Sequence, residues 1–482
     1  MSLRPFLLAA LPLILFACDS TIQPPPDTEL PPPPPDPPVP ALVVSAPVPA
    51  FAPVPTAKQL EWQRMEMTAM IHYGPSTYNR TGHGWESWPV VPDSINPSAW
   101  NPRQWTQVAR ETGIRGIIMV AKHHNGFHLW PTETSDFDIA LAPFEGGTGD
   151  MVGDVAEAAQ ADSLAFGVYL SPWDMHAPDF ETDAYRQRYH DQVRELMTAY
   201  GPVFEIWFDA ARGDGIDLDH IRLSDAARLA YSIQPDVMAG PLGPPPDFRW
   251  GGNEEGIGEE SNWMRRPGYW QAPECNFPMR RNWFWAPSDD DRVMTAEDLV
   301  ATYFTTQGRS CQFLIGLSPD HTGRLTASDV QTLRDFRARL DAIFADDIAA
   351  FRPTVASDVR DSRAMWAGRQ ATDPRDGTFW ATSEGTTQAT LEIELDGEQT
   401  FTVVEIREPI EYGQRIGSHR VEVWDGAAWQ TVVSATTVGY RRLHRIERAT
   451  TTKVRLVIDE VLAPPVVSQF SLYDAEGLTP DA

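Results

Sequence analysis

Basic residues are scarce in this sequence. It has 39 Lys and Arg against 67 Asp and Glu, which gives a formal net charge of -28 and a pI near 4.7. Nucleic acids and anionic lipid surfaces select basic protein faces, so this balance argues against both as partners. A neutral glycan is indifferent to such a charge, whereas a polyanionic glycan is repelled.

Long apolar runs are lacking at the N-terminus. The apolar run of residues 6–17 follows one arginine and is too short to span a bilayer comfortably, which predicts a secretory signal over residues 1–17. It ends in Leu-Phe-Ala-Cys, which resembles the cleavage box of bacterial lipoproteins and makes Cys18 the predicted lipidated residue. Plain secretion is the alternative, because Phe16 is bulky for its place in that box. We therefore expect a secreted bacterial lipoprotein of the cell envelope, on the periplasmic or outer-membrane surface, that meets the membrane only through this anchor.

Cysteine is rare after this segment, where only Cys275 and Cys311 remain. They can pair in an oxidising compartment or stay two buried thiols, and the sequence leaves both possibilities open. Residues 18–57 are instead rich in proline, which fixes φ and lacks an N–H group. This stretch is predicted to be a lipidated, semi-rigid spacer of about 3 Å per residue.

A length of 482 residues suggests two folded units. In residues 58–350, apolar runs at 67–72, 116–121, 165–170, 204–208 and 311–317 alternate with helical patterns at 102–112, 152–163, 184–200 and 327–344. This alternation indicates parallel strands with helical crossovers. Polar residues follow the ends of these runs, as they do at the rim of a (β/α)8 barrel, so we predict an α/β fold with a barrel of that kind. Residues 239–285 are poor in helical pattern, which predicts an irregular barrel there.

Residues 351–482 have a different pattern. Short alternating or β-branched runs occur at 389–395, 401–407, 419–424, 453–458 and 467–473, and turn residues separate them. This pattern predicts a C-terminal β-sandwich domain.

Two carboxylates are candidates for catalysis. Asp209 ends the apolar run 204–208, and a carboxylate at a buried strand end carries a desolvation penalty that favours a function over a mere cap of the next loop. Glu254 lies in a loop with Trp250 and several glycines. Loop carboxylates are usually just solvated, but two carboxylates on separate barrel loops can flank a glycosidic bond.

Two adjacent histidines, His123 and His124, follow the run 116–121 at a point where Asn125-Gly126 ends the strand. Both rings can therefore reach the rim. Binding of sugar hydroxyls, burial in the core and metal ligation remain open, although metal is disfavoured because no third ligand stands at a recognised spacing.

These segments together resemble glycoside hydrolase family 29, the α-L-fucosidases. His72-Tyr73-Gly74, Lys122 to Phe127, Leu170 to Asp174 and Tyr200 to Asp209 are similar to its motifs in order and spacing. The loop 249–254 and the segment 272–276 resemble its α-1,3/1,4-fucosidase branch.

The resemblance implies a retaining exo-fucosidase acting on a fucosylated oligosaccharide or glycan, without a metal or organic cofactor. Asp209 would be the nucleophile and Glu254 the acid/base. It also implies a set of sugar-binding residues, with Glu86 chosen from an altered segment and Trp173 packing nearby: His72, Glu86, His123, His124, Tyr169, Trp173 and Trp250. The main alternative is a related exo-glycosidase acting on α-L-galactosides or on other fucose linkages. A non-catalytic glycan-binding surface lipoprotein is a further alternative.

Overall fold

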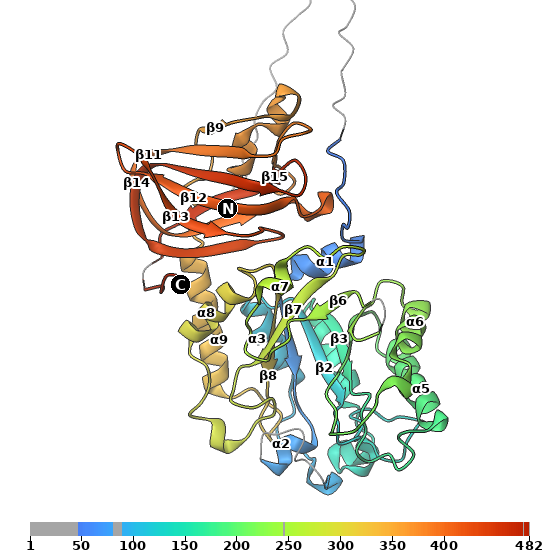
Figure 1. Cartoon of the computed structure of the whole chain (residues 1–482). Helices are drawn as coiled ribbons and strands as arrows, with labels where there is room; N and C mark the ends of the chain where they lie inside the picture. Colours follow the sequence, from blue (N-terminus) through green and yellow to red (C-terminus); the bar gives the residue numbers. More distant parts are fainter. Residues whose placement is uncertain (1–46, 81–88, 244–245, 476, 482) are drawn as a thin grey trace, which may run out of the picture. The chain divides into compact units, whose positions relative to one another are not determined.

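A computed structural model of the chain describes residues 47–80, 89–243, 246–475 and 477–481. Its first folded part is a parallel sheet in the order β5-β4-β3-β2-β1-β8-β7-β6, curled into a nearly closed barrel (Figure 1). The predicted barrel is therefore confirmed. Its strands are Met67–Ile71 (β1), Gly116–Lys122 (β2), Ala165–Leu170 (β3), Val203–Phe208 (β4), Met238–Pro241 (β5), Phe248–Trp250 (β6), Ala272–Pro278 (β7) and Gln312–Leu317 (β8).

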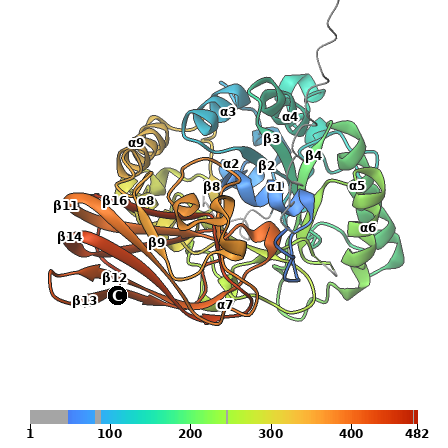
Figure 2. The same cartoon turned by 90° about the horizontal axis from the view of Figure 1, so that it is seen from above.

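Several helices lie around the outside of the barrel, as the view from above shows (Figure 2): Pro102–Glu111 (α3), Met151–Ala161 (α4), Asp183–Ala199 (α5) and Leu223–Ile233 (α6). Local capping sets where several of them begin. Asn101 accepts a hydrogen bond from the Gln104 N–H at the start of α3, and Asp150 does the same for Gly153 in α4. The other helices are Ala57–Met65 (α1), Pro75–Asn79 (α2), Glu260–Trp263 (α7), Ala296–Thr305 (α8) and Ala327–Ile343 (α9).

Residues of the barrel strands alternate between two cores. On β2, Ile118 and Val120 belong to the cluster inside the barrel, whereas Ile117 and Met119 pack in the cluster that includes the surrounding helices. Trp62 of α1 is part of the inner cluster and stacks on Phe248 with ring centroids 5.3 Å apart. The interior is thus filled with side chains below the rim.

The barrel is irregular where the sequence predicted it. No helix separates β5 from β6 in the described residues, and α7 between β6 and β7 has only 4 residues. The strand ladder is open between β5 and β6 within the described part, where the Asp247 N–H donates to the Ala239 carbonyl at 3.0 Å. A disulfide joins Cys275 of β7 to Cys311 just before β8, which settles the pairing that the sequence left open.

The C-terminal part is antiparallel, as predicted for a sandwich. Its main sheet has the order β13-β12-β14-β11-β16, with β9 paired to β11, and β10 and β15 form a second, smaller sheet. These strands are Thr354–Ala356 (β9), Trp380–Ala381 (β10), Ala389–Arg407 (β11), Ile416–Trp424 (β12), Trp429–Ala435 (β13), Arg442–Val461 (β14), Val466–Val467 (β15) and Gln469–Tyr473 (β16).

Several of the predicted sandwich strands have other limits than expected. The runs 389–395 and 401–407 form one strand, β11, because its ladder with β14 continues past a register shift between Glu394 and Gln399. The run 467–473 is divided between β15 and β16, which belong to different sheets.

Ion pairs link the barrel to the sandwich. Glu66, directly after α1, lies 3.2 Å from Arg407 and 3.1 Å from Arg441. The described end of the predicted spacer also packs on this part of the chain, since Val48 clusters with Trp366 and the Phe51 N–H donates to Tyr412. None of the helices formed by described residues is long and apolar enough to cross a membrane.

Candidate active site

A cavity of 490 Å³ lies at the carboxyl ends of the barrel strands. Residues predicted from separate stretches of the sequence line it together. They come from the ends of β1 to β4, from the end of β6 and from the loop after it: His72, His123, His124, Tyr169, Asp209, Trp250 and Glu254.

Asp209 follows β4, and its two carboxylate oxygens have different donors. Oδ2 accepts a hydrogen bond from the Tyr169 hydroxyl, and Oδ1 accepts one from the Ala211 N–H at 2.8 Å. Burial raises the pKa of this carboxyl, while the donors from Tyr169, Ala211 and Ala210 oppose that rise. The side chain keeps 18% of its surface exposed, so it is fixed in place yet open to the cavity.

His124 is held in one tautomer by Ser171. The Ser171 hydroxyl donates its single proton to the Trp173 carbonyl at 2.7 Å, so it must accept at 2.7 Å from Nδ1–H of His124. Burial, and then the nearby His72, lower the pKa of His124 to about 3, so the ring is neutral. Its Nε2 then carries a lone pair, and this atom lies 3.6 Å from Oδ2 of Asp209. The arrangement places an uncharged ring beside the carboxylate of Asp209.

The other two histidines of the cavity also remain neutral. Burial lowers the pKa of His72 and that of His123 well below the usual range, and neighbouring histidine rings add to both effects. The ring of His123 stacks parallel to Tyr169, with centroids 5.8 Å apart. The wall behind Asp209 is therefore made of uncharged rings that can exchange hydrogen bonds with sugar hydroxyls.

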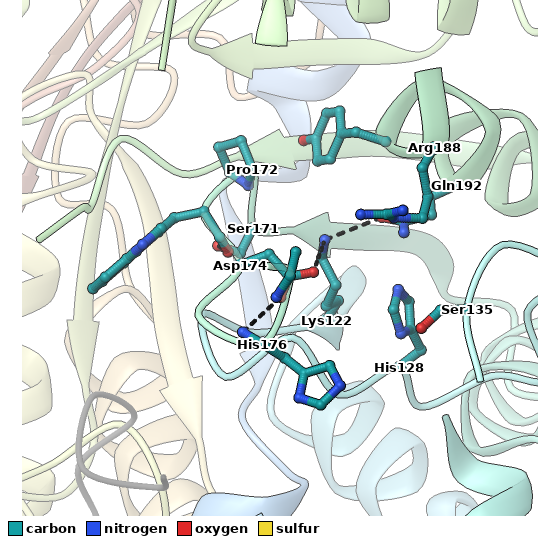
Figure 3. A network of polar contacts seen from close by, with 12 residues as sticks. Lys122, His128, Ser135, Ser171, Pro172, Asp174, His176, Arg188 and Gln192 are labelled. Carbon is teal, nitrogen blue, oxygen red and sulfur yellow. Dashed lines mark hydrogen bonds and ion pairs between the residues drawn. The ribbon is translucent and has the colours of Figure 1, made fainter. Parts of the chain in front are cut away.

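A buried polar network surrounds Lys122, the residue directly before His123 in the sequence (Figure 3). Lys122 is fully buried at the end of β2, and its Nζ lies 3.4 Å from Asp174 and 3.1 Å from the Gln192 amide oxygen. Asp174 also lies close to the turn that follows β2. A Cβ on Gly126 in that turn, whose φ is +78°, would lie 2.1 Å from Oδ1 of Asp174. This is why a glycine stands at that turn, which fixes the direction of the chain just after His123 and His124.

Glu254 belongs to the segment 251–258, here called the Glu254 loop. Its carboxylate is exposed and accepts a hydrogen bond from the indole Nε1 of Trp283 at 3.0 Å. The Trp283 ring also packs against His72, with centroids 4.7 Å apart. Gly316 on β8 leaves room for that indole, because a Cβ there would lie 2.5 Å from it. Trp283 thus contacts both Glu254 in the loop and His72 after β1.

Below the cavity, two carboxyl groups lie in the barrel interior. Glu205 on β4 and Glu274 on β7 are fully buried, and each accepts an indole N–H at 2.6 Å, from Trp62 and Trp207 respectively. Burial raises the pKa of both, and for Glu205 the neighbouring Glu274 adds to the rise. Glu205 and Trp207 alternate along β4 and Asp209 follows directly after it, so the buried pair lies under the cavity.

The remaining predicted residues fall elsewhere. Trp173 is not one of the described residues that line the cavity, but its ring lies 5.3 Å from that of His124. Glu86, Cys18 and residues 244–245 of the loop before Glu254 lie outside the described residues. In the described ranges, no group of three or more His, Cys, Asp or Glu side chains is arranged to hold a metal ion.

Several cavity residues were not predicted from the sequence. Trp283, Arg281 and Asn282 line the cavity, and Asn276 accepts a hydrogen bond from the Trp250 indole at 2.7 Å. Their segment carries no helical or strand periodicity beyond Pro278, so pattern alone did not distinguish them. The signal that was available is the run Trp283-Phe284-Trp285 in a stretch already rich in aromatic residues.

Comparisons with known families and proteins point in one direction. The α-L-fucosidase family matches residues 48–342, and the family described as NedA-like, galactose-binding domain matches residues 370–456. A rice protein, Putative alpha-L-fucosidase 1 of Oryza sativa subsp. japonica, is 34% identical over 451 residues, covering 89% of this chain and 86% of that protein. Alpha-L-fucosidase 1 of Arabidopsis thaliana is 32% identical over 449 residues, with 87% of each chain covered. The crystal structure of SpGH29 has a TM-score of 0.82 and 30% identity, and covers 89% of this chain and 100% of its own.

Proposed function

This chain belongs to glycoside hydrolase family 29, the α-L-fucosidases, and we propose that it removes terminal fucose linked α-1,3 or α-1,4 from oligosaccharides or glycoconjugates by a retaining double displacement. The observation that carries this proposal is that Asp209 and Glu254 line the same cavity from different elements. Asp209 is fixed by three donors, and Glu254 accepts a hydrogen bond from Trp283. A retaining mechanism needs two carboxyl groups at one site, and this cavity has them.

In the first step, an oxygen of Asp209 attacks the anomeric carbon of fucose while the bond from that carbon to the glycosidic oxygen breaks. Glu254 gives its proton to the departing oxygen. In the second step, Glu254 takes a proton from water, the water oxygen bonds to the anomeric carbon, and the bond to Asp209 breaks. Fucose leaves with retained configuration, and both carboxyl groups return to their starting states.

The neutral histidines support recognition of an uncharged sugar. Nε2 of the uncharged His124 lies 3.6 Å from Oδ2 of Asp209, and His72 and His123 are also kept uncharged by burial. The net charge of -28 agrees with a neutral glycan as substrate. The branch-like segments at 249–254 and 272–276 support the α-1,3/1,4 linkage.

A product assay tests this proposal. The chain should release fucose from α-1,3- and α-1,4-fucosylated trisaccharides much faster than from α-1,2 or α-1,6 fucosides or from α-L-galactosides. Proton NMR during the first minutes should show the α-anomer of fucose before mutarotation. Preference for another linkage or sugar overturns the substrate, and the β-anomer overturns the mechanism. Binding of the glycans without any product would mean that the chain is a lectin-like protein.

We also propose that the chain is anchored to the cell envelope through lipid on Cys18. Support comes from the signal-like residues 1–17 and the proline-rich stretch that follows. In a bacterial host that expresses the full chain, labelled palmitate should enter the wild-type protein and not a Cys18→Ala variant. Equal labelling of both, or of neither, contradicts the anchor.

A further inference from the structure

The Glu254 loop begins beside one half of the disulfide. Gly251 follows β6, and its N–H donates to the Glu274 carbonyl of β7 at 2.7 Å. A Cβ on Gly251 would lie 2.9 Å from Sγ of Cys275, a distance that real Cβ atoms essentially never show. The backbone of the loop therefore lies directly on the sulfur of Cys275.

The Glu254 loop ends beside Cys311, the second cysteine of the disulfide. The Gly258 N–H donates to the Thr305 carbonyl at 2.8 Å, and Arg309 donates to the Gly258 carbonyl at 3.0 Å. A Cβ on Gly258 would lie 3.5 Å from Cβ of Cys311. The segment 305–311 thus supports the end of the loop through backbone and side-chain contacts.

The middle of the loop depends on the same segment. The Thr305 hydroxyl donates to the Gly256 carbonyl at 2.8 Å, and the Asn253 side chain donates to the Ile257 carbonyl at 2.8 Å. Glu254 is one of the exposed residues between these contacts. Its position is therefore set by how β7 and the segment 305–311 lie relative to each other.

Cys275 and Cys311 join these two supports covalently, and both are buried. We propose that this disulfide is a positioning element for Glu254, so that its loss weakens proton transfer to the leaving group more than attack by Asp209. The proposal rests on the proposed function, because it assumes that Glu254 is the proton donor. Misplacement of a reacting group by about 1 Å can cost roughly 100-fold in rate.

The test compares substrates that differ in their need for a proton. A glycan leaving group departs as an alkoxide unless its glycosidic oxygen is protonated, whereas 2,4-dinitrophenolate departs without a proton. The ratio kcat/KM reports the first bond-breaking step for both. In the Cys275→Ala/Cys311→Ala variant, kcat/KM should fall at least about 10-fold on an α-1,3-fucosylated trisaccharide and less than about 2-fold on 2,4-dinitrophenyl α-L-fucoside.

A second variant tests the contact itself without removing the disulfide. Gly251→Ala should produce the same selective loss, because its new Cβ displaces the loop from Cys275. In the disulfide-free background the same substitution should have a much smaller further effect, because the sulfur is gone. A Val454→Ala variant, which opens a gap in the buried sandwich core, serves as the control for general destabilisation.

The outcomes separate the two proposals. If the wild type hydrolyses neither fucoside, the proposed function fails. If the wild type is active but the disulfide-free variant loses both substrates equally, or behaves like the Val454→Ala control, the disulfide is only structural and this inference is wrong. Additive effects of Gly251→Ala and the cysteine pair would also contradict it.

Discussion

Asp209 lies at the end of a barrel strand, only 18% exposed, with Tyr169 and two backbone N–H groups around its carboxylate. Glu254 lies in an eight-residue loop that contains four glycines, and its carboxylate is exposed with the Trp283 indole as a donor. The first setting suits a group that attacks the same atom in every substrate. The second suits a group that must reach leaving groups of different shape. Substitutions around Asp209 should therefore lower the hydrolysis of all fucosides alike. Substitutions in the Glu254 loop should lower only the hydrolysis of fucosides whose leaving group needs a proton.

The largest effect is expected from loss of the nucleophile. Asp209→Gly should lower kcat by on the order of 10⁴-fold or more on the trisaccharide and on 2,4-dinitrophenyl α-L-fucoside alike. Both substrates need the same attack, so neither is spared. Initial rates on the two substrates, with folding checked by circular dichroism, measure this. A folded variant with undiminished activity on either one contradicts the role of Asp209.

A selective loss is expected on the loop side. Glu254→Ala should lower kcat/KM by about 10²–10⁴-fold on the trisaccharide and leave that for the dinitrophenyl substrate nearly unchanged. With azide present, the variant should form a fucosyl azide of retained configuration, because azide needs no base. Equal losses on both substrates would contradict separate roles for the strand end with Asp209 and the loop with Glu254.

A smaller, unselective loss is expected at Ser171. Ser171→Ala removes the acceptor of Nδ1–H of His124, which costs roughly 1.5 kcal/mol, or about 10-fold in kcat/KM. Because the damage lies on the fucose side, both substrates should lose by the same factor. Ser232→Ala on α6, which removes a hydroxyl bonded to the Leu229 carbonyl, is the matched control. A loss confined to the trisaccharide would contradict the assignment of His124 to the sugar.

The last expected effect is on stability rather than on rate, and it concerns the buried carboxyl pair below the cavity. The folded-state pKa of Glu274 is raised above 4.5, its value in an exposed setting, so the folded protein holds this proton more tightly than the unfolded chain. The stabilisation is complete below pH 4.5 and is lost as pH rises through the folded-state value. Glu274→Gln cannot ionise. Relative to wild type, it should gain stability as pH rises from 5 to 8, by at most about 1.4 kcal/mol per pH unit.

Urea unfolding at several pH values measures this gain. Glu392→Gln in the sandwich, whose carboxylate is partly exposed beside Lys453, is the control and should show no such trend. A constant difference between Glu274→Gln and wild type across this range would mean that Glu274 is ionised in the folded protein.

Much of the barrel could be predicted because its strands are short and buried on both faces. The run 165–170 was predicted with the bounds that β3 has, since apolar residues stop where polar ones begin. The sandwich was harder. Strand β11 continues through a register shift whose residues look like a turn, and hydrophobic pattern cannot distinguish an irregular ladder from a loop.

In the candidate site, too, some residues could be predicted from the sequence and others could not. Asp209 could be recognised from its place after an apolar run, because a buried carboxylate is costly without a purpose. Glu254 required resemblance to a family, because exposed loop carboxylates are common. Trp283 was missed, since its contacts with Glu254 and His72 depend on a loop path and on the absence of a side chain at Gly316. No local pattern encodes such a contact.

Trapping of the covalent intermediate tests the central claim most directly. A 2-deoxy-2-fluoro-fucosyl fluoride should inactivate the protein by forming a slow fucosyl–enzyme ester. Mass spectrometry of the digested protein should then place one fluorofucosyl group on the peptide that contains Asp209, with none on the Asp209→Gly variant. A label on Glu254 or on another residue, or no label on a protein that hydrolyses fucosides, would contradict the mechanism.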